Sequence, residues 1–251
     1  MSTTLALILA LAPIGQTDGL FEKFFEGFAK NRDAIQTLQA HFTQETITPD
    51  ETLTTTGTIV YTNPKRLVFR YDDPALVYII EGNRFYDYDP EIEQLQIFNI
   101  EDRPEAEAFF LGLSKDTDRL QEAYTIQLLP PVDPKRAGAS LQLLPRQKEG
   151  EEPLFERIIL QLDPEHFLPS QIHIVSDEES EVLYVLDAFT INEPLSLENT
   201  HIFLLEGTDI IRDDEFVETV GPGGKYMPEA SPEPDDASIE TPLSAQEPSA
   251  P

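Results

Sequence analysis

The side chains that could carry out catalysis or hold a metal ion are few in this sequence. There is no cysteine, which removes thiol nucleophiles, disulfides, thiolate metal sites and iron–sulfur clusters. The four histidines, His41, His166, His173 and His201, include no pair at the i, i+4 spacing with which a helix presents two metal ligands. We therefore expect no metal site and interpret the histidines as surface or core residues.

Carboxylates are abundant, with 47 Asp and Glu against 17 Lys and Arg. The segment Asp87 to Glu91 has a superficial likeness to a calcium loop, but Pro90 and the lack of a glycine at the turn favour a turn between strands. Other acidic runs fall at expected turns, so their closeness indicates no acid–base pair. No nucleophile elbow, P-loop or dinucleotide fingerprint is present. We predict no catalytic residue and no cofactor, and we keep an enzyme acting on a lipid or glycan head group as the weaker alternative.

The net charge of -30 bears on the class of partner. A strongly anionic surface repels phosphate backbones and anionic membranes, so nucleic acid is excluded as a partner. The same excess of carboxylates is typical both of salt-adapted proteins and of merely acidic ones, and the charge alone does not separate these.

The two ends of the chain differ in composition from its middle. An apolar run from Leu5 to Ala12, followed by Pro13, is typical of a signal peptide and too short to span a bilayer, although no Lys or Arg precedes it. Residues 1–16 are therefore a possible signal peptide or an ordinary apolar segment. Residues 221–251 are rich in Pro and acidic residues, which predicts a disordered tail. We expect one domain over 17–220.

Two segments have the pattern of amphipathic helices. In the first, phenylalanines recur at three- and four-residue spacing with charged residues between them; they are Phe21, Phe24, Phe25 and Phe28. The second lies in the long interruption from 102 to 120 and carries Phe109, Phe110 and Leu113. Exposing such stripes would be costly, so both helices are expected to cover an apolar surface.

From residue 42 the period of the hydrophobic pattern changes to two, and we count about eleven short strands separated by turn residues. Links such as Asn63-Pro64-Lys65 and Glu81-Gly82-Asn83 favour hairpins. The expected fold is mainly β (α+β), with a single antiparallel sheet and no room for parallel crossovers.

The third of these strands indicates which face is apolar. Leu67, Phe69 and Tyr71 alternate with Arg66 and Arg70, so one face is apolar and the arginines are expected on a face toward water. A long single sheet must coil, and its concave side is then either a filled core or a cavity. The pattern alone leaves both open.

Several short pieces occur in a characteristic order. They are Phe42-Thr43-Gln44, Gly57 to Pro64, Leu67 to Tyr71, Pro74, Gly82, Tyr86 to Pro90 and Gln94, followed by Phe109-Phe110-Leu111 and Phe203 to Asp209. This ordered set resembles the periplasmic outer-membrane lipoprotein carrier (LolA-like) family, most closely over residues 20–100 and more weakly to about 212.

The resemblance implies an unclosed half-barrel whose concave apolar face is lidded by helices and takes the acyl chains of lipoproteins in the periplasm, without a cofactor. The partners it implies are a release complex at the inner membrane and an acceptor at the outer membrane; we expect a monomer. The expected acyl-cavity residues are Ile59, Tyr61, Leu67, Phe69, Tyr71, Ile79, Phe109, Phe110 and Leu113, and the expected lid helix carries Phe21, Phe24, Phe25 and Phe28.

One residue departs from the family pattern. Typical carriers have an arginine directly before the proline that is Pro64 here, and it helps to hold the lid shut, whereas this chain has Asn63. The resemblance therefore also admits a different lid closure, another amphiphile such as a glycolipid or polyprenyl lipid as cargo, or a sensor or accessory subunit built on the same fold.

Overall fold

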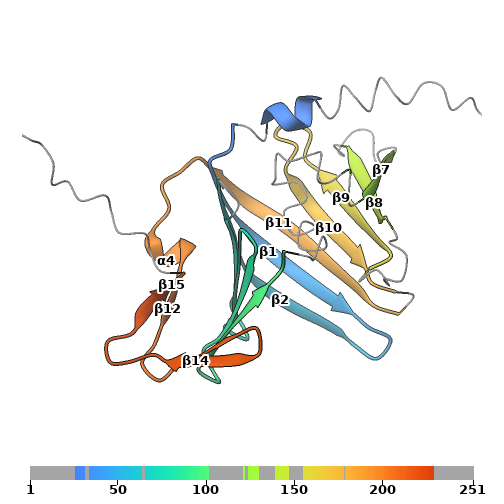
Figure 1. The fold of residues 1–251 in the computed structure, drawn as a ribbon. Coiled ribbons are helices and arrows are strands. Elements are labelled where there is room, and N and C mark those ends of the chain that lie inside the picture. The colour runs from blue at the N-terminus through green and yellow to red at the C-terminus, as the bar shows by residue number, and fades with distance from the viewer. Residues whose placement is uncertain are drawn as a thin grey trace, which may run out of the picture.

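The computed structural model describes residues 26–31, 34–63, 66–101, 121, 124–129, 139–146, 155–177 and 179–228. A large sheet dominates it (Figure 1). Its strands are β1 (Thr37–Ile47), β2 (Thr52–Thr62), β3 (Arg66–Tyr71), β4 (Val77–Glu81), β5 (Arg84–Asp89), β6 (Gln94–Asn99), β7 (Tyr124–Leu129), β8 (Ser140–Pro145), β9 (Arg157–Leu162), β10 (Pro169–Val175), β11 (Glu181–Ile191), β13 (Asp209–Arg212) and β14 (Glu215–Thr219). A second sheet pairs β12 (Ile202–Leu204) with β15 (Lys225–Met227).

The strand order in the large sheet is β14-β13-β6-β5-β4-β3-β2-β1-β11-β10-β9-β8-β7, so its two edges, β14 and β7, do not meet. The prediction of a mainly β fold with one unclosed sheet is confirmed. Two details are wrong: the sheet has 13 strands, and β13 pairs with β6 in parallel. The parallel pairing is possible because the chain from β6 to β13, residues 100–208, is long enough for the crossover that two parallel neighbours need.

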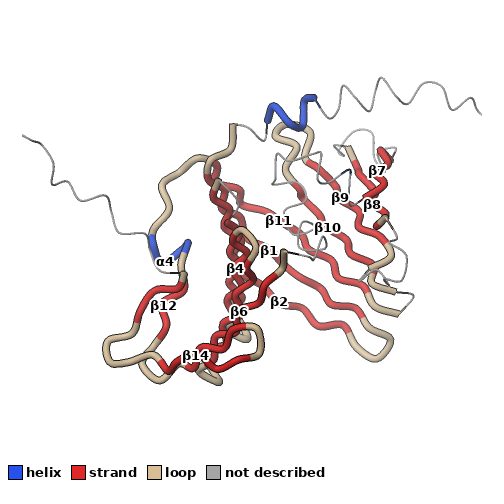
Figure 2. Tube along the Cα trace, in the orientation of Figure 1, coloured by secondary structure: helices blue, strands red, loops and turns tan. Residues whose placement is uncertain are grey.

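A helical lid is not supported. Among the described residues, the helices are a short one at 26–31 and α4 (Leu197–Thr200), coloured blue in Figure 2. Phe28, on the first of these, is buried in a cluster with strands β7, β8 and β9. The other expected lid residues, Phe21, Phe24, Phe25, Phe109, Phe110 and Leu113, and the possible signal peptide at 1–16, lie outside the described residues.

The large sheet curls toward the face that carries Leu67, Phe69 and Tyr71. Tyr71 on β3 and Tyr184 on β11 are separated by β2 and β1, yet their hydroxyl oxygens lie 3.4 Å apart. Three strand intervals span about 14 Å in a flat sheet, so the two side chains meet because the sheet bends toward them. Figure 1 shows the same bend, from the broad region of β1, β11 and β10 to the strands near β4, seen edge-on in Figure 2. We call this side the concave face.

The opposite, convex face differs from the prediction that it would be wet. Residues 195–228 are here called the C-terminal strap: β13 and β14 within it extend the large sheet, and other parts of it cover the convex face, where Val68 and Ile79 are fully buried in one cluster with Ile202, Leu204 and Met227. The prediction was wrong because β3 is apolar on both faces between its arginines, and the chain supplies a second set of apolar residues after position 200. The described structure also continues beyond residue 221, where the tail was predicted to begin, because β15 pairs with β12.

Candidate ligand-binding face

Aromatic rings form a continuous row across the concave face. From β11 to β6, neighbouring ring centroids lie 5.9 Å apart for Tyr184–Phe42, 5.1 Å for Phe42–Tyr71, 5.3 Å for Tyr71–Tyr78, 5.6 Å for Tyr78–Phe85 and 6.2 Å for Phe85–Phe98. Phe69 lies beside Phe42, at 6.0 Å. All these separations fall within the range in which aromatic pairs attract each other. We call this set, including Phe69, the aromatic row.

Gly57 allows the row to cross β2. The pairing register places Gly57 between Phe42 on β1 and Tyr71 on β3. A Cβ atom at this position would lie 2.6 Å from Cζ of Phe42 and 2.0 Å from the carbonyl oxygen of Arg70. No residue with a side chain fits there, and the ring of Phe42 covers the glycine to reach Tyr71.

Most expected cavity residues that the structure describes lie on this face, but one does not. Ile59, Tyr61, Leu67 and Phe69 are buried in one cluster, with Tyr71 packed against it. Ile79 is on the convex face, in the cluster under the strap. The register explains the error: Ile79 pairs with Val68, while Tyr78 pairs with Phe69 and Ile80 with Leu67, so Tyr78 and Ile80 take the concave positions. Whether any of them touches a ligand stays a prediction.

One end of the aromatic row is polar. The Tyr71 hydroxyl donates to Oε1 of Gln44 at 2.9 Å, and Nε2 of Gln44 donates to Oγ1 of Thr46 at 3.0 Å. Burial raises the pKa of Tyr71 and of Tyr184, so both phenols stay neutral. The Oγ1 atom of Thr55, opposite Gln44 in the ladder, is buried and has no hydrogen-bond partner. The described polar contacts at this end therefore join β1, β3 and β11 through Gln44, Tyr71 and Tyr184.

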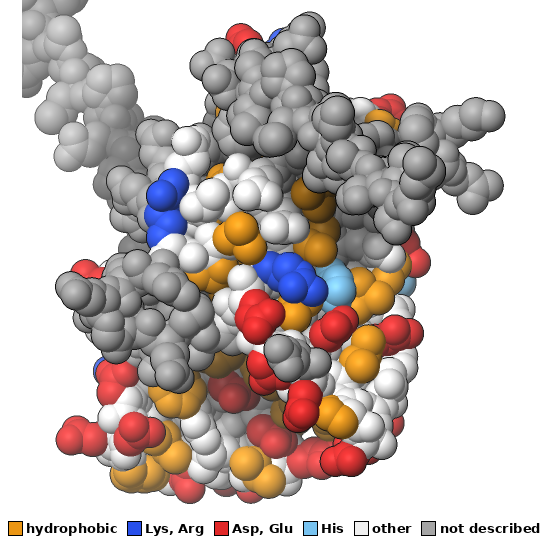
Figure 3. All heavy atoms as spheres, turned by 90° about the vertical axis from the view of Figure 1, so that its right-hand side faces the viewer, with side chains coloured by type: hydrophobic (Ala, Val, Ile, Leu, Met, Phe, Trp, Pro, Cys, Tyr) orange, Lys and Arg blue, Asp and Glu red, His pale blue; other side chains and the backbone are white. Residues whose placement is uncertain are grey.

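The charge on the concave face is negative. On strands β1 to β11, the charged residues at concave positions are Asp87 and Asp89, since the cationic residues alternate onto the convex face; these are His41, Arg66, Arg70, Arg84, Arg157 and His173. Burial, and after it the Asp89 carboxylate, raise the pKa of Asp87. Figure 3 shows the side of the molecule that lies at the right of Figure 1, where Asp and Glu lie among apolar side chains and a Lys or Arg side chain lies beside a His near the centre.

No metal centre is formed by the part of the chain that the structure describes, where no three or more His, Asp or Glu side chains group in a way that could hold an ion. Asp89 closes the turn between β5 and β6 by accepting from the backbone N–H of Glu91 at 2.9 Å, as expected for this segment. His173 on β10 pairs with Glu181 on β11 at 2.7 Å, on the convex face. Among the described helices, none is long and apolar enough to cross a membrane.

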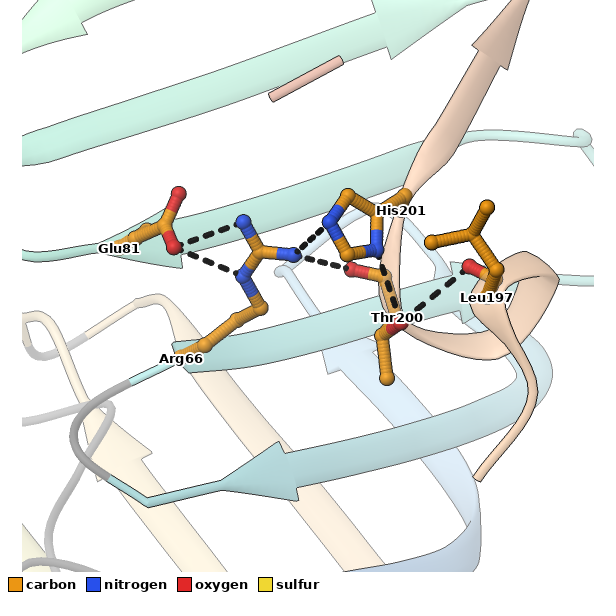
Figure 4. Close-up of polar contacts among 5 residues, drawn as sticks. All are labelled: Arg66, Glu81, Leu197, Thr200 and His201. Atoms are coloured by element: carbon orange, nitrogen blue, oxygen red, sulfur yellow. Dashed lines mark hydrogen bonds and ion pairs between the residues drawn. The ribbon is translucent and has the colours of Figure 1, made fainter. Parts of the chain in front are cut away.

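The strap is fastened to the sheet through Arg66 (Figure 4). The guanidinium contacts Glu81 through Nη2 at 2.7 Å and Nε at 3.0 Å, while Nη1 donates to the carbonyl oxygen of Thr200 at 3.1 Å and to Nε2 of His201 at 2.8 Å. Because arginine only donates, Nε2 must accept, which places the proton of the neutral ring on Nδ1, 2.8 Å from the Thr200 hydroxyl. Burial, and then Arg66, lower the pKa of His201.

Arg70, four residues further along β3, makes a second attachment. Its Nη2 atom donates to the backbone carbonyl oxygens of Glu198 and His201. Sequence reasoning placed both arginines in water and missed these contacts. Directly after the C-terminal end of β2, the backbone N–H of Asn63 donates to the carbonyl oxygen of Gln36 at 2.9 Å. Asn63, the residue that departs from the family pattern, therefore ties the end of β2 to the segment before β1.

Comparison with known proteins places this fold. The model of the family described as "Outer membrane lipoprotein carrier protein LolA" matches residues 33–199. A search of curated proteins finds no match. Among solved structures, an uncharacterized conserved protein from Thermus thermophilus aligns with a TM-score of 0.49 and 11% identity, covering 77% of this chain and 99% of that one. A putative outer membrane lipoprotein-sorting protein domain from Vibrio parahaemolyticus gives 0.42 and 11%, covering 71% and 96%. A LolA superfamily protein from Nitrosomonas europaea gives 0.40 and 11%, covering 71% and 96%.

The family model spans more than half of the 251 residues and ends within α4, so it takes in the whole aromatic row and leaves out most of the strap. On the strength of that match, the chain belongs to the outer membrane lipoprotein carrier (LolA) family.

Proposed function

We propose that this protein is a periplasmic carrier that holds the acyl chains of lipoproteins against its concave face and delivers them toward the outer membrane. The observation that carries the proposal is the aromatic row, a continuous apolar surface on the inside of a sheet that does not close. Each methylene group taken out of water contributes about 0.8 kcal/mol, so a long acyl chain binds well without covalent chemistry. Transfer of the acyl chains from a release complex to this protein, and from this protein to an acceptor, then requires only that each recipient binds them more tightly through its own apolar surface.

The residues of this face differ in exposure, and the difference separates core residues from residues that a ligand can contact. Ile59 and Leu67 are almost fully buried and serve as core, whereas Tyr78, Phe85 and Phe98 are half-buried. A ligand can reach only the second kind without unfolding the sheet. The proposed acyl contacts are therefore the half-buried rings of the aromatic row, a set that differs from the one expected from the sequence.

The experiment measures binding of a fluorescent monoacylglycerol to the purified chain and to two variants that each place a glutamate at a phenylalanine. Phe85→Glu puts the charge in the aromatic row, and Phe216→Glu, at an exposed position on the edge strand β14, is the matched control. We expect Phe85→Glu to weaken binding by about tenfold or more, since an ion would enter an apolar surface. Phe216→Glu should bind like the unaltered protein.

Mass spectrometry of the protein gently purified from its native host should show an acylated molecule still bound. Equal binding by Phe85→Glu and the unaltered chain would contradict the proposed face. Absence of any bound lipid, together with one stable protein partner, would instead favour a sensor or accessory subunit.

A further inference from the structure

The strand β14 forms one border of the large sheet, together with three turns beside it. β14 is the last strand in the sheet order, so its outer side has no neighbouring strand in the described part of the chain. Two of the turns are held close by backbone hydrogen bonds: the N–H of Asp209 donates to Glu93 at 2.8 Å, and that of Gly207 donates to Val220 at 2.9 Å. We call β14 with the turns at 90–93, 205–208 and 213–214 the acidic edge; Figure 1 shows β14 at the lower border of the fold.

Exposed apolar side chains gather on the acidic edge. Half of the large apolar side chains that are exposed in the described structure belong to it, namely Ile92, Leu205, Phe216 and Val217. Phe216 is 63% exposed and Val217 45%, and every residue of β14 is exposed. Exposed apolar patches mark interaction sites, and an edge strand also offers unpaired backbone N–H and C=O groups. The acidic edge therefore has both features of a place where another chain adds as a strand.

The charge around these apolar side chains is negative. Against two cations, the acidic edge carries a set of exposed carboxylates: Glu91, Glu93, Glu206, Asp213, Asp214, Glu215 and Glu218. The cations are Arg212, which lies opposite Glu215 in the ladder, and Lys225, which contacts Glu218. The other carboxylates make no ion pair with a described residue, so they remain available to the cationic side chains of a partner.

The same charge decides which chain can add to this edge. A second copy of the protein would bring its own Glu215 and Glu218 against these residues, and like charges that face each other across paired strands are destabilising. Each copy also carries a net charge of -30. A basic segment would instead bring Lys or Arg to the carboxylates, and its apolar side chains would cover Phe216 and Val217. The charge therefore opposes self-pairing and favours a basic partner.

We propose that β14 is a docking strand for an extended, basic segment of a partner protein, in which Lys or Arg alternates with apolar residues. The segment pairs with the outer side of β14 through backbone hydrogen bonds, and its side chains meet the carboxylates and apolar side chains of the acidic edge. The inference goes beyond the carrier function and does not rest on it, because the acidic edge contains none of the rings of the aromatic row. β14 also lies outside residues 33–199, which the family model matches.

The test uses a capped synthetic peptide of about ten residues, a usual upper length for a strand, in which lysine and valine alternate. The comparison peptide has the same sequence with N-methyl groups on two consecutive central residues. Consecutive residues of a strand direct their N–H groups to opposite edges, so the methyl groups block pairing on both edges and leave the charge unchanged. Salt is held at about 0.15 M, which screens distant charges.

Affinities are measured for the full chain and for two variants with the same change in net charge. Glu215→Lys changes the acidic edge, and Asp50→Lys changes an exposed turn between β1 and β2. We expect the unmethylated peptide to bind at least about tenfold more tightly than the methylated one, because strand addition depends on backbone hydrogen bonds. Glu215→Lys should weaken its binding about fivefold, since one attraction becomes a repulsion, and Asp50→Lys should stay within about twofold.

Equal affinities of the two peptides for the unaltered chain would show attraction by net charge alone and would overturn the inference, as would the absence of binding. This comparison decides the outcome even where a variant fails to fold, which circular dichroism detects. Equal losses in folded Glu215→Lys and Asp50→Lys would remove the site from β14. A dimer of the unaltered chain that the peptide dissociates would assign the edge to a second copy, and the inference would fail.

Discussion

Gly57 offers the sharpest test of how the concave face is built. Replacing it by alanine puts a methyl group 2.0 Å from the carbonyl oxygen of Arg70 and 2.6 Å from the ring of Phe42. The ring can tilt, but the carbonyl belongs to the β2–β3 ladder and can move only if the strands separate. Overpacking of this kind costs about 3 kcal/mol, the upper part of the usual range, because one of the two obstacles is backbone. For a domain of this size that corresponds to a fall in Tm of about 6 to 12 °C.

The measurement is urea unfolding of the unaltered chain and of Gly57→Ala, with Gly221→Ala as the control. Gly221 has nothing within 4 Å of the position of an added Cβ, and its backbone conformation suits alanine. The control should therefore stay within about 0.5 kcal/mol of the unaltered protein. A Gly57→Ala protein as stable as the control would refute the crossing of the aromatic row over β2, and with it the close contact between Phe42 and Tyr71.

A double variant separates the two obstacles. Phe42→Leu shortens the side chain that lies over Gly57, so it should recover part of the loss caused by Gly57→Ala but not the part due to the carbonyl of Arg70. Full recovery would mean that the ring alone forbids a side chain at position 57. No recovery would mean that only the backbone matters there.

Three further outcomes concern the strap and Asp87. Arg66→Met should cost about 2 kcal/mol in urea unfolding, because it breaks four contacts of a buried guanidinium, while Arg157→Met, at an exposed 3.9 Å ion pair, should cost almost nothing. The pKa of His201 is lowered by folding, so the stability that the neutral ring contributes is present above its unfolded pKa of 6.5 and is lost as the pH falls. In His201→Gln, the free energy of unfolding should therefore depend less on pH between about pH 7.5 and 5. The pKa of Asp87 is raised, so its carboxylate opposes folding above that pKa, and Asp87→Asn should be the more stable protein at neutral pH, with the difference shrinking as the pH falls.

Sequence patterning predicted the strands well where alternation and turn residues agreed. The strand predicted from the alternation of Leu67, Phe69 and Tyr71 with Arg66 and Arg70 is β3. It is bounded by short turns, and its aromatic residues share one face while its arginines share the other. The same reasoning missed the strands after residue 205, because β13, β14 and β15 have three to five residues and are too short to show a period.

The error at Ile79 has a different physical origin. In β4 the run Val77-Tyr78-Ile79-Ile80 is apolar at every position, so a period of two cannot say which residues face the concave side. The hairpin turn between Glu81 and Arg84 decides the register, and that register places Tyr78 on the concave face. Strands that are apolar throughout are buried on both faces, and this pattern in β4 was the available signal for the strap.

The strap and the aromatic row together explain why stability and ligand binding can be separated in this fold. Val68 and Ile79 pack against the strap on the convex side, while Leu67 packs on the concave side, so β3 and β4 are clamped from both faces. The half-buried rings of Tyr78 and Phe85 lie on top of that clamped layer and contribute less to it. A charge at Phe69, which is 8% exposed, should therefore unfold the sheet, whereas a charge at Phe85 should leave it folded and weaken only the binding of acyl chains. Circular dichroism of the two glutamate variants distinguishes these outcomes, and loss of the folded signal in Phe85→Glu would show that the aromatic row is core and not a binding surface.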